Sequence, residues 1–334
     1  MVSFLRHAVA RRRIVKIFRT ALVGLGLAGR GSGPKGFAES HAGAICTQGG
    51  FELVAAVDPS KTARQALKDL LPKVLLYSEP GELKDHLRLD LVVFAEPPDV
   101  RLANVIQLLR ILQPSAVLLE KPVAQSLDHA KQIVELLTEA GVSSFVSFPR
   151  RADSITRSLK EEFFSGDPAA PTRGHVWYSK NPLNSAIHFL NLVDYWAGPL
   201  QTSTLIRSGQ DPNRPQFMVQ GKSSTFIFTP TPGAEWVHNS VDVMLAGGRL
   251  RYDFGGRVVE LHLPKPGLED EPVVELTPQV FSLDPDNRFF QMYQEVHKAL
   301  SGNRNQYALT TGADALRQQT LIHRVLPRQE HLTR

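Results

Sequence analysis

The sequence feature that most constrains the fold is a glycine pattern near the N-terminus. The apolar run Thr20–Val23 continues into Gly24-x-Gly26-x-x-Gly29. This spacing predicts a buried strand that turns tightly into a helix, because Gly24 allows the turn, Gly26 lets a ligand approach the backbone and Gly29 lets the helix pack on the strand. The start of such a helix offers free N–H groups to phosphates. The pattern therefore predicts a dinucleotide site, and a structural glycine turn is the alternative.

A carboxylate after the next apolar run supports the dinucleotide interpretation. Asp58 follows Phe51–Val57, at the position where such a unit accepts hydrogen bonds from the adenosine ribose. The interval from the glycine pattern is longer than the usual spacing of about 20 residues, so we expect an insertion around Arg30–Gly50. A carboxylate repels a 2′-phosphate, so Asp58 favours NAD over NADP. Lys61 and Arg64 are close enough in sequence to leave NADP possible.

Length and charge limit the other classes of protein. A chain of 334 residues that is 42% hydrophobic can bury a large core, and it is expected to form two domains of roughly 150 residues. Six of its 38 Lys and Arg residues lie in residues 1–19, which hold no acid, so the remainder has 32 basic against 33 acidic residues. The body is therefore neutral, and we expect no nucleic-acid partner.

The basic segment 1–19 is predicted to be an N-terminal extension separate from the domains. It is poor in Ser and runs directly into the first strand, which favours a disordered or mis-started terminus over a transit peptide. Nucleic-acid binding by this segment is a less favoured alternative. No apolar stretch reaches about 18 residues, so we expect no membrane partner. Cys46 is the only cysteine, which fits a reducing compartment and a cytoplasmic location.

Residues 20–149 are predicted to form a doubly wound parallel sheet, because short apolar runs alternate with helix-like segments. A helix is expected from near Ser126, ended by Gly141. The predicted strands are Leu22–Val23, Leu53–Val57, Val74–Tyr77, Leu91–Ala95, Ala116–Leu119 and Ser143–Phe148.

Residues 150–334 are predicted to form a substrate-binding and oligomerisation domain. This part is rich in strand-like runs, and Gly247-Gly248 and Gly255-Gly256 are typical of hairpins, so we expect an open, mostly antiparallel sheet. Helices are expected at 287–300 and 313–326. The fold class is thus an α/β Rossmann domain followed by an α+β domain with helices on one face of its sheet.

Two further stretches carry side chains suited to chemistry. Glu120-Lys121-Pro122 follows a buried strand at its C-terminal end, which is the side of such sheets that binds ligands. Pro122 biases Lys121 away from helix, so the ammonium stays at the strand end. The alternative is a solvated Lys121 that pairs with Glu120.

The second stretch runs from Tyr178 to Trp196. If it is helical from about Asn184, then Asn184, His188 and Asn191 form a polar stripe at i, i+4 and i+7 on an otherwise apolar helix. Such a stripe needs partners. The alternative is that His188 is satisfied by groups in the core.

These motifs together resemble the oxidoreductases of the glucose-fructose oxidoreductase / inositol 2-dehydrogenase / MocA (Gfo/Idh/MocA) family. The resemblance runs from Thr20 to about Leu326, and Glu120-Lys121-Pro122 is its most specific part. It implies that Lys121 and His188 flank the nicotinamide and the substrate hydroxyl. The wording Tyr178-Ser-Lys-Asn-Pro-Leu183 is most similar to the branch found among nucleotide-sugar and surface-polysaccharide enzymes.

The resemblance also implies binding residues, with some departures from the family pattern. Expected cofactor contacts are Gly24, Gly26, Gly29, Asp58, Pro97 and Glu120, and expected substrate contacts are Asn184, Lys180 and Arg151. Asn184 and Asn191 replace two usual Asp residues, Arg101 stands where a His is common, and Glu96-Pro97-Pro98 replaces a Thr-Pro pair. The loss of two carboxylates removes groups that would raise the basicity of His188.

The expected reaction is reversible hydride transfer between a nicotinamide and a carbinol carbon of a sugar, nucleotide sugar or cyclitol. We expect neutral His188 to accept the hydroxyl proton and Lys121 to stabilise the developing negative charge. The reverse assignment is permitted if Lys121 is desolvated. No metal is expected, since no His or Cys pair has ligand spacing.

Two further expectations concern partners. A non-catalytic sensor or partner subunit of the same fold is the alternative function. The open sheet around Val241–Leu263 leaves a broad surface in need of cover, so we expect a homodimer or homotetramer.

Overall fold

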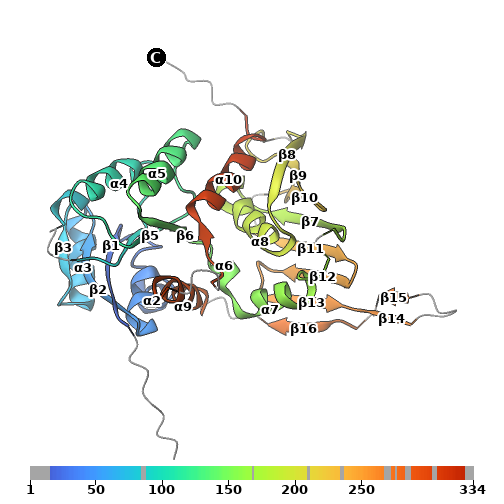
Figure 1. Ribbon diagram of the computed structural model, residues 1–334, viewed down its shortest axis with the longest axis horizontal. Helices are drawn as coiled ribbons and strands as arrows, with labels where there is room; N and C mark the ends of the chain where they lie inside the picture. The colour runs from blue at the N-terminus through green and yellow to red at the C-terminus, as the bar shows by residue number, and fades with distance from the viewer. Residues whose placement is uncertain are drawn as a thin grey trace, which may run out of the picture.

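The computed structural model describes residues 16–327 apart from 84–87, 168, 209–210, 234–236, 267–271, 275–276, 283–286 and 303–306 (Figure 1). Most of the predicted basic extension, residues 1–15, lies outside the described residues. Within these ranges, no helix has the length and apolar character needed to cross a membrane.

The N-terminal part of the chain is built on a seven-stranded sheet with the order β17-β6-β5-β4-β1-β2-β3. Its first six strands along the chain are parallel and have the order of a doubly wound dinucleotide-binding fold, as predicted. Strands β4 and β5 are buried at every residue, because helices or other elements cover both sheet faces. The strands are β1 (Phe18–Val23), β2 (Phe51–Val57), β3 (Leu75–Tyr77), β4 (Leu91–Phe94), β5 (Ala116–Leu119) and β6 (Ser143–Val146).

The connections between these strands are mostly helical. The predicted helix after Ser126 is α5 (Leu127–Glu139): the Ser126 hydroxyl accepts the His129 N–H at 3.2 Å, and Gly141 follows the helix with a φ of 69°. The other helices here are α1 (Gly33–Ala38), α2 (His41–Gln48), α3 (Lys61–Leu70), the 3₁₀ turn η1 (Pro80–Glu82) and α4 (Arg101–Leu109).

The prediction that a helix directly follows the glycine pattern was wrong. Residues 27–30 form a turn, and the next helix, α1, begins only at Gly33. The cause lies in the backbone of Gly31 and Gly33, whose positive φ angles of 74° and 66° interrupt a right-handed helix. The expected insertion therefore contains two short helices, α1 and α2.

The second sheet has eight strands in the order β16-β13-β12-β11-β7-β10-β9-β8. It is mostly antiparallel, as predicted, and only β7 and β10 pair in parallel. Both glycine pairs stand between adjacent antiparallel strands, β11 to β12 and β12 to β13. The strands are β7 (Thr172–Tyr178), β8 (Leu200–Arg207), β9 (Gln216–Gly221), β10 (Ser224–Pro230), β11 (Ser240–Leu245), β12 (Gly248–Asp253), β13 (Val258–His262) and β16 (Gln279–Ser282).

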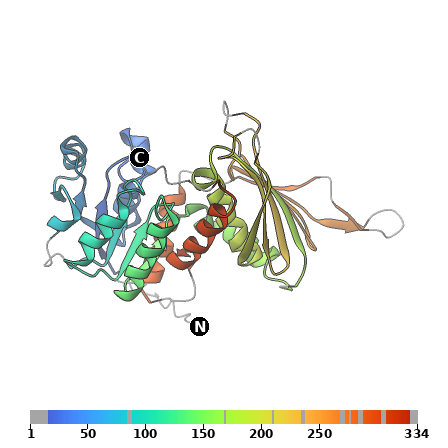
Figure 2. The same cartoon turned by 90° about the horizontal axis from the view of Figure 1, so that it is seen from above.

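Helices fill the space between the two sheets (Figure 2). α8 (Ile187–Ala197) packs its aromatic side chains on the second sheet: the ring of Trp196 lies 5.7 Å from that of Tyr252 on β12. α10 (Gly312–His323) contacts both α8 and α5, so it joins the two parts of the molecule. The connection from β6 to β7 contains α6 (Pro149–Ala152) and α7 (Ser154–Phe163).

The C-terminal part of the chain returns to the first sheet, which the sequence analysis did not predict. α9 (Arg288–Leu300) packs on α2, and β17 (Thr310–Thr311) pairs antiparallel with β6 (Figure 1). The predicted boundary between residues 149 and 150 assigns α9 and β17 to the second domain. Both elements nevertheless contact elements of the first domain, α2 and β6.

The face of the second sheet that points away from α8 has no helix over it in the described part of the chain (Figure 2). Large apolar side chains on this face are partly exposed, among them Trp177, Ile227, Met244 and Val280. The hairpin of β14 (Pro264–Pro266) and β15 (Pro272–Val274) projects beyond the sheet (Figure 1).

Candidate active site

The three predicted glycines lie at the C-terminal end of β1, and each has a distinct environment. A Cβ on Gly24 would stand 2.4 Å from the Glu96 nitrogen, and one on Gly29 would stand 1.9 Å from the Gly24 oxygen, so backbone packing requires glycine at both positions. Gly24 also has a φ of 91°. Gly26 is exposed, and a Cβ there would meet nothing within 4 Å, so its backbone is open to a ligand.

The turn after Gly24 presents a cradle of backbone N–H groups. Those of Arg30 and Gly31 donate to the Gly26 oxygen at 2.9 and 3.1 Å, whereas those of residues 26–28 have no hydrogen-bond partner in the described residues. Free N–H groups around an exposed glycine are suited to a diphosphate. The loop thus fits a dinucleotide, even though no helix starts inside it.

Asp58 fixes this loop in addition to facing the expected ribose position. Its Oδ2 accepts the Leu25 N–H at 2.7 Å and its Oδ1 accepts the Ser60 N–H at 2.8 Å. Each carboxylate oxygen keeps further acceptor capacity for a ribose hydroxyl. Arg64 donates to the backbone carbonyl oxygens of Asp58 and Pro59, at 2.6 and 3.0 Å, so its guanidinium is fixed next to this turn.

Lys121 follows the end of β5 and reaches the second domain. Its Nζ lies 3.0 Å from the carbonyl oxygen and 3.4 Å from the Oδ1 of Asn184. Burial lowers the pKa of Lys121, the carboxylate of Glu120 opposes this, and the charges of Arg150 and Lys180 lower it further. The ammonium of Lys121 is therefore easier to deprotonate than an ordinary lysine.

Glu120 is held by protein groups. Its Oε1 lies 3.0 Å from His41 Nε2, and His41 Nδ1 lies 2.9 Å from the Tyr293 hydroxyl on α9. Burial raises the pKa of Glu120, but the hydrogen bond and charge of His41 outweigh this, so the net pKa is lowered. The carboxylate anchors α9 and α2 to the Lys121 strand end. Pro97 is exposed in the loop after β4, and the cofactor contacts of Pro97 and Glu120 stay predictions.

Arg101, at the start of α4, fixes the backbone on both sides of Lys121. Its Nη1 donates to the carbonyl oxygens of Glu120, Pro122 and Val123, and its Nε donates to Glu96 Oε1 at 3.2 Å. The side chain of Arg101 is fully buried. This residue, which departs from the family pattern, is therefore a positioning residue for the lysine.

His188 lies near Lys121 but has an unusual environment. A π-helical turn, η3 (Pro182–Ala186), carries Asn184, and α8 begins just before His188, so the predicted helix from Asn184 starts with irregular geometry. His188 Nδ1 is buried, and it has no hydrogen-bond partner in the part of the chain that the structure describes. Burial and the nearby charges of Arg150, Lys121 and Arg288 hold the pKa of His188 well below its ordinary value, so the ring is neutral at pH 7.

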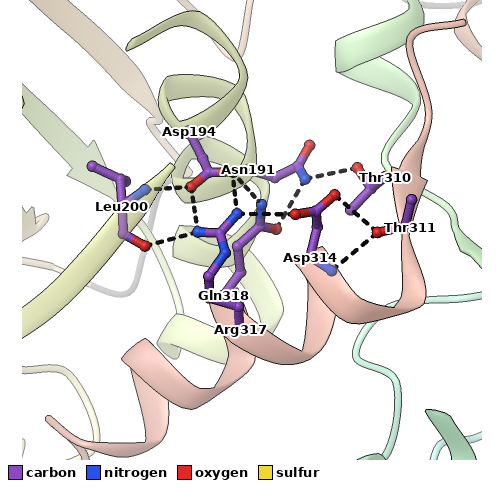
Figure 3. A network of polar contacts seen from close by, with 8 residues as sticks. All are labelled: Asn191, Asp194, Leu200, Thr310, Thr311, Asp314, Arg317 and Gln318. Carbon is purple, nitrogen blue, oxygen red and sulfur yellow. Dashed lines mark hydrogen bonds and ion pairs between the residues drawn. The ribbon is translucent and has the colours of Figure 1, made fainter. Parts of the chain in front are cut away.

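Asn191, the third member of the predicted stripe, does not face this site (Figure 3). Its Nδ2 donates to Thr310 Oγ1 at 2.8 Å and to Gln318 Oε1 at 2.9 Å. The same network holds the ion pair of Arg317 and Asp194 at 2.7 Å. The stripe prediction is corrected for Asn191, since α10 covers this part of α8 and uses the amide to bind the two helices together.

The predicted substrate residues Lys180 and Arg151 have different positions. Lys180 is exposed, has a φ of 59°, which is rare outside glycine, and lines a cavity of about 310 Å³. Arg151 stacks on Tyr195, with its guanidinium carbon 4.4 Å from the ring centroid. Its neighbour Arg150 instead lines a second cavity, because successive residues of a helical turn point about 100° apart. Sequence reasoning missed Arg150.

Comparison with known proteins agrees with this geometry. Residues 18–148 match the family described as "Oxidoreductase family, NAD-binding Rossmann fold". An inositol 2-dehydrogenase of Rubrobacter xylanophilus is 34% identical over 101 residues, which are 30% of this chain and 28% of that relative.

Two solved structures illustrate the likeness in fold. An oxidoreductase from Agrobacterium radiobacter, in complex with NAD+, L-tartaric acid and magnesium, has a TM-score of 0.68 at 18% identity, covering 92% of this chain and 94% of that one. The WlbA dehydrogenase from Bordetella pertussis, in complex with NADH and UDP-GlcNAcA, has a TM-score of 0.66 at 18% identity, covering 93% and 95%.

A Rossmann sheet is joined through packed helices to an open, mostly antiparallel sheet, and these solved structures share that fold. Its first domain is of the NAD-binding class. Residues 18–148 match the model of the Gfo/Idh/MocA oxidoreductase family, which confirms the resemblance for this part of the chain.

Proposed function

We propose that this protein is an NAD(P)-dependent oxidoreductase that interconverts a CH–OH group and a carbonyl on a sugar, nucleotide sugar or cyclitol. The observation that carries this proposal is the contact of Lys121 Nζ, from the Rossmann sheet, with Asn184, one helical turn before His188. A cation and an imidazole from two domains thus converge at the sheet edge that also bears the glycine cradle. Asp58 favours NAD as the cofactor.

Of Lys121 and His188, Lys121 is the better proton acceptor, whereas the sequence analysis assigned this role to His188. It permitted the reverse assignment if Lys121 is desolvated, and burial is the largest cause of the lowered pKa of Lys121. His188 has a pKa too low to take a proton readily and therefore orients the hydroxyl as a neutral ring. A bound nicotinamide would supply the hydride chemistry, and Asn184 would hold the lysine in place.

This assignment predicts opposite pH dependences for the two directions. Alcohol oxidation needs neutral Lys121, so its kcat/KM should rise with pH through the lysine pKa, which lies below the ordinary 10.5. Carbonyl reduction needs the ammonium and should fall over the same range. Glu120, Arg150, Lys180 and His188 are the charged or titratable groups around this lysine. An oxidation rate that falls between about pH 6 and 10 would contradict the assignment.

The test of the function itself is absorbance at the reduced-nicotinamide band with a panel of neutral and acidic sugars, nucleotide sugars and cyclitols, each with NAD and NADP. Turnover with at least one of them supports the enzyme. Cofactor binding without any turnover would favour the alternative, a non-catalytic sensor or partner subunit. Two features favour that alternative. Asn184 is an amide where the family usually has a carboxylate, and His188 Nδ1 has no hydrogen-bond partner among the described residues.

We also propose that two or four copies of the chain associate through the open face of the second sheet. Its partly exposed side chains include Trp177, Ile227 and Met244, and burial of such a face would be favourable. Light scattering at micromolar concentration should give a dimer or tetramer. A monomer at that concentration would refute this part of the proposal.

A further inference from the structure

A cavity of about 640 Å³ is lined by three arginines, Arg150, Arg257 and Arg288. They come from parts of the chain far apart in sequence: α6, the turn between β12 and β13, and the first turn of α9. The remaining described lining residues are Val237, Asn239, Phe254, Gly255 and Val258, none of which carries a negative charge.

Two of these guanidinium groups are held against each other. Arg150 Nε and Arg288 Nη2 both donate to the carbonyl oxygen of Gly255, at 3.4 and 3.1 Å. The Arg150 guanidinium also stacks on Phe189, 5.0 Å from the ring centroid. Like charges this close repel one another, and one shared carbonyl dipole offsets only part of that repulsion.

Arg288 is buried, Arg150 is half-buried, and their donors are incompletely satisfied. Arg288 is only 8% exposed, and its Nε has no hydrogen-bond partner among the described residues. Burial lowers the pKa of Arg150 to about 10. The hydroxyl of Tyr252, whose pKa responds to both charges, is buried beside Arg150 and satisfies part of the hydrogen-bonding capacity of that guanidinium. Unpaired donors of this kind are costly unless a ligand satisfies them.

The carboxylates nearest to the cavity are engaged elsewhere in the described part of the chain. Asp153 Oδ1 accepts the Ile155 and Thr156 N–H groups as the N-cap of α7. Asp253 pairs with Arg251 at 3.1 Å. Among the described residues neither carboxylate forms an ion pair with Arg150 or Arg288. The charge of Arg288 does act on Asp153, but Asp153 directs its hydrogen bonds to the α7 backbone, so the described carboxylates leave the guanidinium donors of the cavity available to a ligand.

We infer that this cavity binds an anionic group of the substrate, a carboxylate or a phosphate, and so selects an acidic sugar or sugar phosphate over a neutral one. A guanidinium pair suits either group, because each arginine can donate two parallel N–H bonds to its oxygens. The inference rests on the proposed function for the identity of the remaining sugar. Arg150 stacks on Phe189, the residue after His188, and the charges of Arg150 and Arg288 both act on His188, so the cavity lies on the His188 side of the molecule.

The test is equilibrium binding of D-glucuronate, D-glucose 6-phosphate and D-glucose to the NADH-loaded protein, measured by calorimetry. One of the two anions should bind at least about tenfold more tightly than glucose, since hydrogen bonds to charged groups are among the strong ones. Which anion binds identifies the group as a carboxylate or a phosphate. Arg288→Gln and Arg150→Gln should each weaken anion binding by about 10- to 100-fold and leave glucose binding unchanged.

Three controls keep the outcome interpretable. Arg249→Gln removes an outward-facing arginine of β12, paired with Asp242, and should change nothing. NADH fluorescence should give the same cofactor affinity in every variant. This result would show that the arginines bind the anionic group of the substrate and not the phosphates of the cofactor. If the Arg288 variant fails to fold, exposed Arg257→Gln should still weaken anion binding several-fold.

Equal binding of anions and glucose, or anion binding that survives loss of Arg288, Arg150 and Arg257, overturns the inference. These measurements need no turnover. A protein that binds anions through the arginines but oxidises nothing would therefore refute the proposed function and leave the anion site standing.

Discussion

Replacing Lys121 with methionine should lower kcat for sugar oxidation by about 10³-fold or more, with little change in NADH affinity. A positioned proton acceptor contributes about 10²- to 10⁴-fold, and a charge aimed at a developing alkoxide contributes about 10²- to 10³-fold more. Methionine keeps the length and apolar stem of Lys121 but removes both functions. The measurement is the initial rate at saturating substrate, followed by reduced-nicotinamide absorbance.

An arginine at the same position separates the two functions. Lys121→Arg keeps the positive charge but cannot release a proton near neutral pH. If Lys121 moves the proton, the arginine variant should be nearly as inactive as methionine. If it supplies only charge, the arginine variant should retain much of the rate. Lys131→Met, an exposed position on α5, is the matched control and should be fully active. Activity above a tenth of wild type in K121M would remove Lys121 from the chemistry.

The parts of the fold that follow local rules were predictable from the sequence. Buried parallel strands are continuously apolar, as in β4 and β5, and glycine pairs accompany the hairpins of the second sheet. Lys121 and His188 could be singled out because a charged or polar residue among apolar neighbours needs a reason. Their proximity depended on the family resemblance, since 67 residues separate them in the chain.

The rest depends on packing that local patterns do not contain. Arg288 enters the cavity because α9 returns to the first domain and packs on α2, more than 100 residues after the second domain begins. Arg150 and Arg151 are adjacent in sequence, and only the placement of α6 decides which of them lines the cavity. The signal that could have drawn attention to them is the adjacent pair Arg150-Arg151, which directly follows the predicted strand Ser143–Phe148 and Pro149.

Arg101 illustrates a missed role that carries a large predicted effect. It is 0% exposed, its Nη1 binds three carbonyl oxygens around Lys121, and it is paired with Glu96, which is 8% exposed. Burial raises the pKa of Glu96 to about 7, although the charge of Arg101 opposes the rise. Without the arginine the carboxyl would be buried with no partner, and the loop that holds Lys121 would lose its anchor.

We therefore expect Arg101→Met to lower the free energy of unfolding by about 3–5 kcal/mol at pH 8, the cost of leaving one member of a buried pair alone. The loss should be smaller at pH 5. A folded-state pKa raised above the unfolded value means that Glu96 favours folding while protonated, and that this contribution is lost as pH rises through about 7. Without the charge of Arg101 the pKa of Glu96 should rise further, so at pH 5 Glu96 is protonated. A neutral carboxyl is less costly to bury without a partner, and the loss of unfolding free energy is therefore smaller at pH 5. Urea unfolding at both pH values measures this, with exposed Arg110→Met, at the C-terminal end of the same helix, as the control. Equal losses at pH 5 and pH 8 would show that Arg101 acts through the three carbonyls alone, because Glu96 is the side chain to which Arg101 is bonded in the described residues.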